Sequence, residues 1–277
     1  TKETLRLVED ARKRGVDVTV DQYPYTASST GISALFPQWS LEGGREALLE
    51  RLAAAEQRAR IKGEIVTRIV EGRGGGDARN IVIANCPFDA SIAGRSLAGL
   101  AIQQGRKPSP EEAAEIAMEL QKKGNCTAVY HAIAEEDVDR IMRRPYAMIA
   151  SDGGIVRMGQ GAPHPRNYGT FARVLGMYVR ERGIVTLEEA IRKMTSFPAA
   201  RLKIWDRGLL MPGMIADIVV FDADRVKDEA TFEKPHQYAT GFRHVFVNGK
   251  AVLLDARMTG ERPGRVLYGP GAATSQR

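Results

Sequence analysis

The sequence predicts an α/β fold that ends in a small section made of strands alone. Tyr146–Ala150 is an apolar run that stops at Asp152 and two glycines, which is typical of a strand buried on both faces of a parallel sheet. Strands and helices alternate until about Leu202. After this residue, strands follow one another without a long helix, so we expect the chain to have two parts.

The N-terminal region begins this alternation. Thr1–Arg14 has apolar residues at helical spacing, and Val16–Asp21 follows as a strand rich in β-branched residues. The segment Gln22–Thr30 is expected to be a polar, aromatic loop. Its dense hydroxyl groups favour substrate contact, although the tyrosines also suit simple packing against the rim. The substrate-binding candidates in this loop are Tyr23, Tyr25, Ser28 and Ser29.

Several later elements carry clear local signals. A helix is expected from about residue 45 to residue 61 and a strand at residues 80–85. Ser109 and Pro110 start a helix that runs to about Lys123, because Ser suits the N-cap and Pro the first helical position. Thr186 opens another helix with a capping box. Strands are also expected at residues 127–131, 216–222, 244–248 and 251–254, the last two joined by an Asn248-Gly249 turn.

Composition excludes several classes of function. The net charge of +6 and the isoelectric point near 9.4 arise from basic residues interspersed with acidic ones, so we expect no nucleic-acid partner. No apolar run reaches the roughly 20 residues that cross a bilayer, so no membrane role is expected. Cys86 and Cys126 are too few and too far apart to indicate a disulfide framework or a metal knuckle, and a reducing cytoplasm is the expected compartment.

Asp152 is the main candidate for chemistry. The carboxyl ends of parallel strands face the active-site crevice, so Asp152 is placed either as a catalytic base or as a cap of the next loop. Of the four histidines, His164 is a candidate for binding or orienting substrate, and His131 is left undecided. His236 and His244 are expected to be structural. The chain has no His-x-His or His-Glu-x-x-His motif, so its own motifs assign no metal ligand.

Several segments, in order along nearly the whole chain, resemble the N-acyl-D-amino-acid deacylases, or D-aminoacylases, of the amidohydrolase superfamily. The block from Ser-Asp-Gly to His-Pro-Arg and the Arg-Pro-Gly-Arg-Val-Leu segment are specific to this family. The resembling segments are Asp21–Tyr25 with Ser28–Thr30, Ser151–Gly153, His164–Arg166, Tyr168–Phe171, Arg173–Gly176, Leu187–Thr195, Pro198-Ala199, Asp206–Gly208, Pro212-Gly213, Ala216–Asp222, Val247–Gly249 and Arg262–Leu267.

The resemblance implies a partial (β/α)8 TIM-like barrel of the amidohydrolase type, followed by a small β-sandwich section. Residues 1–205 would belong to the barrel, with an inserted segment at about 31–125, and residues 206–277 to the β-sandwich. The implied activity is zinc-dependent hydrolysis of N-acyl-D-amino acids, with one or two zinc ions and small-molecule substrates. By position, Asp152 matches the general base and acid of the family, and we infer from its residue type that Arg166 binds the substrate carboxylate.

The sequence departs from the family pattern in its metal ligands. The family carries the His-x-His pair and most other ligands before the region that this chain resembles, so they are expected ahead of Thr1. The chain begins without Met and inside a helix, which is typical of a fragment. A further ligand histidine of the family is expected near Asp21 and Tyr23, where this chain has none. Alone, the 277 residues are therefore expected to be inactive. Two alternatives stay open: an amidohydrolase acting on cyclic amides, as dihydroorotases and hydantoinases do, and a non-catalytic, metal-free barrel scaffold.

Overall fold

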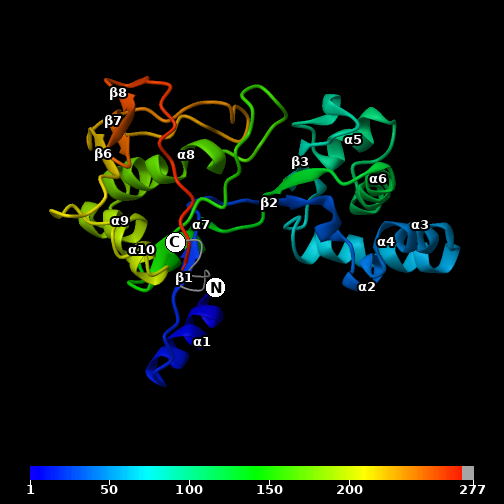
Figure 1. Cartoon of the computed structure of the whole chain (residues 1–277). Coiled ribbons are helices and arrows are strands. Elements are labelled where there is room, and N and C mark those ends of the chain that lie inside the picture. The colour runs from blue at the N-terminus through cyan, green and yellow to red at the C-terminus, as the bar shows by residue number, and fades with distance from the viewer. Residues whose placement is uncertain (270–277) are drawn as a thin grey trace.

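A computed structural model describes residues 1–269. The chain forms two lobes, and β2 lies where they join (Figure 1). The helices are α1 (Lys2–Lys13), η1 (Ile32–Leu35), α2 (Gln38–Leu41), α3 (Gly44–Ala53), α4 (Ala55–Glu71), η2 (Ala78–Asn80), η3 (Ala90–Ile92), α5 (Leu97–Gln103), α6 (Pro110–Lys123), α7 (Glu135–Met142), α8 (Arg166–Arg173), η4 (Val174–Glu181), α9 (Leu187–Met194) and α10 (Ser196–Arg201). The strands are β1 (Val20–Gln22), β2 (Ser28–Gly31), β3 (Ile81–Asn85), β4 (Thr127–Tyr130), β5 (Ala147–Ile149), β6 (Ile218–Phe221), β7 (Phe242–Val247), β8 (Lys250–Leu254) and β9 (Arg257–Met258).

The strands form three separate sheets. Strands β1 and β5 pair in parallel, with Val20 opposite Ala147 and Gln22 opposite Ile149. Strand β4 lies between β2 and β3 and is antiparallel to both. Strands β6 to β9 form an antiparallel sheet in chain order. The mixture of helices and strands is the α/β class that the sequence predicts.

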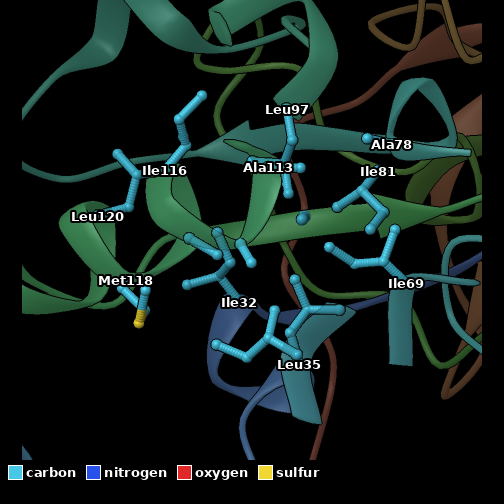
Figure 2. Close-up of a cluster of buried hydrophobic side chains, with 14 of the residues drawn as sticks. Ile32, Leu35, Ile69, Ala78, Ile81, Leu97, Ala113, Ile116, Met118 and Leu120 are labelled. Atoms are coloured by element: carbon cyan, nitrogen blue, oxygen red, sulfur yellow. The ribbon is translucent and has the colours of Figure 1, made fainter. Parts of the chain in front are cut away.

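The helical lobe, which we define as residues Ile32–Tyr130, has its own apolar core. Ile61, Ile65 and Ile69 on α4 are fully buried, and they belong to one cluster with residues of β3, β4, α5 and α6. Figure 2 shows how aliphatic side chains from both sides of β3 and β4 meet in this core. Each fully buried aliphatic side chain stabilises the folded state by about 1.5–3 kcal/mol. The apolar core is therefore a main source of stability in this lobe.

A second apolar cluster lies in the other lobe, where α7, β5, α8, η4 and α9 meet. Val174 and Tyr178 of η4 are fully buried there, together with Val226 from the chain that follows β6. Because η4 directly continues α8, this packing also fixes the direction of α8. The start of α8 then faces the loop that follows β5.

The predicted helix starts and hairpin are confirmed. The Ser109 hydroxyl accepts a hydrogen bond from the Glu112 N–H, and the Thr186 hydroxyl accepts one from the Glu189 N–H. Asn248 has φ of 50° and Gly249 has φ of 78°, as a tight two-residue hairpin turn requires. Within residues 1–269, no helix has both the length and the apolar character needed to cross a membrane.

Several predicted elements differ from the structure. The strand expected over residues 16–21 is shorter, because β1 covers only Val20–Gln22. Part of the expected loop over residues 22–30 is strand β2, because Ser28–Gly31 pairs with β4 although its sequence is polar. The helix expected over residues 45–61 is two helices, α3 and α4, since Ala54 has an extended backbone. The break lets Leu52 of α3 and Ile61 of α4 face the same core.

The expectation that the two cysteines form no disulfide is wrong. Cys86 and Cys126 form a disulfide, with their Cα atoms 4.4 Å apart. The pairing of Asn85 with Thr127 brings the end of β3 beside the start of β4, and this contact closes the 40-residue separation. Disulfides persist mainly in oxidising compartments, whereas the sequence predicts a reducing cytoplasm. The compartment therefore stays a prediction.

Candidate functional site

The parallel pairing of β1 and β5 places two predicted segments at one edge. The Ala150 N–H donates to the Gln22 carbonyl at 2.9 Å, so the two strands end at the same level. Tyr23 comes directly after β1, and Asp152 follows shortly after β5. The carboxyl ends of parallel strands are the usual location of active sites in α/β folds.

Asp152 sits in a tight, solvent-facing turn. Its φ of 46° lies in the left-handed region, which aspartate tolerates better than most residues, and its side chain is 67% exposed. The Gly153 N–H donates to the Ser151 hydroxyl, and the Gly154 N–H donates to the Asn167 side-chain oxygen at 2.9 Å. The turn therefore holds the carboxylate in a position open to water.

Arg166 links the Asp152 turn to the segment after β1. Its Nη2 lies 2.8 Å from the Asp152 carboxylate and donates to the Ser29 carbonyl at 3.2 Å. Its guanidinium carbon lies 4.8 Å from the centre of the Tyr23 ring, which suits a cation–π contact. The side chain is 8% exposed, and Nη1 is buried without a hydrogen-bond partner within residues 1–269. This donor is therefore buried and unsatisfied within the described residues.

His164 lies behind Arg166 and is only 2% exposed. Its Nδ1 accepts a hydrogen bond from the Arg166 backbone N–H at 3.0 Å, and its Nε2 lies 3.0 Å from the Ala27 carbonyl. Burial lowers the pKa of His164 to about 4, so the ring is neutral at pH 7. We refer to Tyr23, Ser29, Asp152, His164 and Arg166 as the site cluster.

Two other predicted residues lie beside the site cluster. Tyr25 is 2% exposed, its ring packs edge-on against His164, and burial raises the pKa of its hydroxyl. Arg173 stacks on the Tyr25 ring with 4.9 Å between the guanidinium carbon and the ring centre. Ser28 is half-buried opposite Tyr130 in the β2–β4 pair and contributes none of the hydrogen bonds that hold Arg166.

Sequence reasoning missed residues that support the cluster from elsewhere. Phe232, in the connection between β6 and β7, packs edge-on against His164, Tyr25 and His131. Asn167 holds the Asp152 turn, and Asp228 pairs with Arg173 at 3.1 Å. No local pattern marks Phe232 or Asp228, because both act across the fold, whereas Asn167 could have been suspected from its place after His164-Pro165-Arg166.

His131, which the sequence left undecided, is half-buried against Phe232. Their ring centres are 4.6 Å apart, and burial lowers the His131 pKa. Tyr168 contacts His236 at 2.9 Å between the phenol oxygen and Nδ1, and the Asp255 N–H donates to His244. These contacts agree with structural roles for His236 and His244.

A cavity of about 310 Å³ is lined by Tyr25 and by Pro165, next to the site cluster. Its walls are formed by the C-terminal half of α8, by η4 and by residues 227–233, and they include Arg173, Asp228 and Phe232. Asp152 and Arg166 do not line it. We therefore locate the candidate site by its chemistry, at the site cluster, and not by the cavity.

The described part of the chain does not itself fit a metal ion. Within residues 1–269, no group of three or more His, Cys, Asp or Glu side chains is arranged to hold one. The two cysteines are joined in the disulfide, and both ring nitrogens of His164 are occupied. The site cluster thus provides a carboxylate, a guanidinium and a phenol, but no metal-binding set.

Known proteins match this chain over nearly its full length. Residues 130–253 match the Amidohydrolase family. A D-aminoacylase of Alcaligenes xylosoxydans xylosoxydans is 36% identical over 267 residues, which is 96% of this chain and 45% of that protein. The chain therefore spans less than half the length of this relative.

Two solved structures are also similar. One is a D-aminoacylase studied for its binuclear metal centre, with a TM-score of 0.70 and 35% identity over 94% of this chain and 44% of that chain. The other is an N-acyl-D-glutamate deacylase from Bordetella bronchiseptica in complex with zinc and a phosphonate inhibitor that mimics the tetrahedral intermediate. Its TM-score is 0.68, with 33% identity over 91% of this chain and 43% of that chain.

Proposed function

We propose that the whole protein hydrolyses N-acyl-D-amino acids, because residues 130–253 match the Amidohydrolase family and the chain is similar to D-aminoacylases. The products are a carboxylate and a D-amino acid. The observation that carries the proposal is the convergence of Asp152, Arg166 and Tyr23 at the shared end of β1 and β5.

Asp152 is the proton carrier of the proposed reaction. Its carboxylate is open to water while Arg166 fixes one of its oxygens. As the water oxygen bonds to the amide carbonyl carbon, Asp152 takes a proton from that water. When the C–N bond breaks, the same proton passes to the leaving nitrogen, which departs as the amine of the D-amino acid.

Arg166 and its neighbours form the proposed substrate wall. The Arg166 guanidinium would bind the substrate carboxylate, because its planar fork fits a carboxylate and its Nη1 has no partner within residues 1–269. Since Nη1 is buried, a substrate oxygen would reach it only after a local movement of the surrounding side chains. The Tyr23 ring holds the guanidinium from one side, and the Ser29 carbonyl holds it from another. Tyr25 and Ser28 complete the wall behind these residues.

We further propose that β1 and β5 are neighbouring strands of a partial (β/α)8 barrel. Their parallel pairing and the functional groups at their carboxyl ends support this arrangement. In this proposal, residues 1–205 belong to the barrel with an insertion at about 31–125, and the sheet of β6 to β9 belongs to the β-sandwich section of residues 206–277.

Zinc is the metal we propose for the whole protein, as one or two ions. Zinc is bound in the solved N-acyl-D-glutamate deacylase, and the solved D-aminoacylase has a binuclear metal centre. Because residues 1–269 do not form a metal site, we assign no ligand among them and route no step through the metal. The 277 residues alone are proposed to be inactive.

The test is an assay of the purified whole protein with N-acetyl forms of several D-amino acids, their L-enantiomers and a cyclic amide, combined with metal analysis. We expect bound zinc and hydrolysis of the D-substrates in clear preference to the others. Preferential hydrolysis of the cyclic amide would instead support a dihydroorotase-like or hydantoinase-like activity. A zinc-free protein without any hydrolysis would support the scaffold alternative.

A further inference from the structure

The hydrogen bonds of His164 define its tautomer. The Arg166 backbone N–H can only donate, so Nδ1 of His164 must be the acceptor and carries no proton. The ring proton therefore lies on Nε2, where it donates to the Ala27 carbonyl at 3.0 Å. A second ring proton on Nδ1 would point at the Arg166 N–H, so the contacts require a neutral ring.

These two contacts join the two segments that form the site cluster. Ala27 lies between Tyr23 and β2, on the chain that provides Tyr23 and Ser29. Arg166 is the first residue of α8, where a backbone N–H has no partner within the helix. His164 thus bridges the start of α8 to the opposite wall of the site.

The surroundings of His164 allow little freedom to its ring. The ring centre lies 5.0 Å from that of Tyr25 and 5.1 Å from that of Phe232, both in edge-on geometry. With 2% exposure and both nitrogens in use, the ring has no free polar atom for a substrate. A direct substrate contact would have to break one of the two hydrogen bonds.

We propose that His164 is a positioning residue that fixes Arg166 through the neutral Nε2–H tautomer, and that this sets how tightly the substrate carboxylate is bound. The inference rests on the proposed function for its kinetic consequence. Its structural content stands on the contacts of His164 alone. In this account Arg166 binds the substrate, whereas His164 acts only through the backbone of Arg166.

The first test is nitrogen NMR of the whole protein labelled at histidine, with His164 assigned by its loss in a His164→Gln variant. At pH 7 we expect a neutral ring protonated on Nε2. A ring protonated on Nδ1, or a charged ring, overturns the proposal. This measurement needs no catalytic activity, so it remains decisive if the proposed hydrolysis is not found.

The second test compares two substitutions that each restore one contact. His164→Asn places an acceptor near the position of Nδ1, and His164→Gln places a donor near that of Nε2. With an N-acyl-D-amino acid as substrate, we expect KM to stay within about threefold for Asn and to rise about tenfold for Gln, with smaller changes in kcat. His244→Gln serves as a background control, and its KM should match that of the wild type.

Hydrogen exchange of the Arg166 amide gives the matching structural measurement. The amide should be protected in the wild type and in His164→Asn, and should exchange faster in His164→Gln. Equal protection in the Asn and Gln variants, or a KM that both leave unchanged, contradicts the proposal. If the wild type does not hydrolyse the substrate, the proposed function fails, and the tautomer and the amide exchange still decide the role of His164.

Discussion

In the helical lobe most of the fully buried side chains are apolar, such as Ile61, Ile65 and Ile69, whereas in the site cluster the buried side chains are His164 and Arg166. The lobe is packed around β3 and β4 and needs few specific hydrogen bonds (Figure 2). In the site cluster, both ring nitrogens of His164 and the Nη2 atom of Arg166 have partners on other segments.

This contrast separates two kinds of sensitivity. Apolar packing is non-directional, so a truncation in the helical lobe mainly changes the free energy of unfolding. Hydrogen bonds and ion pairs are directional, so a change in the site cluster moves a functional group with a smaller effect on stability. The predictions below test this separation and are ordered from the largest expected effect to the smallest.

The largest stability loss is expected for Ile65→Ala in the helical lobe. Ile65 is fully buried, and removing its side chain leaves a cavity that costs about 2–5 kcal/mol of unfolding free energy. Denaturant unfolding measures the loss. The matched control is Ile102→Ala, since Ile102 is 62% exposed and should cost less than about 0.5 kcal/mol. Similar losses for the two variants would contradict the account of the lobe.

Within the site cluster, we expect His164 to make the free energy of unfolding depend most strongly on pH. Its folded-state pKa of about 4 lies below the ordinary 6.5, so the unfolded chain binds more protons between these values. The contribution of His164 to the free energy of unfolding is therefore fully present above pH 6.5, and it is lost as the pH falls towards 4. Because each pKa unit corresponds to about 1.4 kcal/mol, the total loss is about 3 kcal/mol.

Unfolding measured at pH 7 and pH 4 tests this dependence. The positive charge of His164 is disfavoured by three neighbouring groups, Arg166, Arg173 and His131. Between the two pH values, the free energy of unfolding should fall by about 3 kcal/mol more in the wild type than in His164→Gln. Equal losses in the two proteins would show that His164 is not the group that titrates.

Arg166→Lys should weaken substrate binding while leaving the helical lobe unchanged. Lysine keeps the charge but loses the planar fork that contacts Asp152 and Ser29, so KM should rise about tenfold. The control is Arg79→Lys, because Arg79 also pairs with an aspartate, Asp77, but on the surface of the helical lobe. Its KM should equal that of the wild type, and a normal KM for Arg166→Lys would remove Arg166 from the substrate wall.

The smallest effect concerns two asparagines that each form one hydrogen bond to the main chain. Asn167 accepts from the Gly154 N–H beside the Asp152 turn, and Asn80 donates to the Gly74 carbonyl in the helical lobe. Each change to alanine should cost about 1 kcal/mol of unfolding free energy. Only Asn167→Ala should also lower kcat severalfold, because it loosens the Asp152 turn. A kcat that falls equally in both variants would contradict the comparison.

The sequence predicts the elements that carry strong local signals. Ser109 and Thr186 mark helix starts because their hydroxyls cap free N–H groups, and Asn248-Gly249 marks a hairpin because both residues adopt positive φ. Strand β2 was missed, since its polar sequence becomes a strand only through its pairing with β4. The disulfide was missed for a similar reason, because only the register of β3 and β4 brings the cysteines together.

For the candidate site, the sequence identifies the chemical groups better than their arrangement. Asp152 and Arg166 were both candidates, but only the fold shows that they form an ion pair. His164 was a candidate for substrate contact, yet its burial and its two ring hydrogen bonds favour a positioning role. The support from Phe232 depends on a segment far along the chain, which no local pattern reveals.

The central claim is that Asp152 carries the proton in amide hydrolysis, and Asp152→Asn in the whole protein tests it most directly. Asp255→Asn is the matched control, because Asp255 is also exposed and has a φ of 49° in a turn. For Asp152→Asn we predict that kcat falls by about 10²–10⁴-fold while bound zinc and the melting temperature stay unchanged. The control should keep its activity. Near-normal turnover by Asp152→Asn would contradict the claim and leave Asp152 as a cap of its loop.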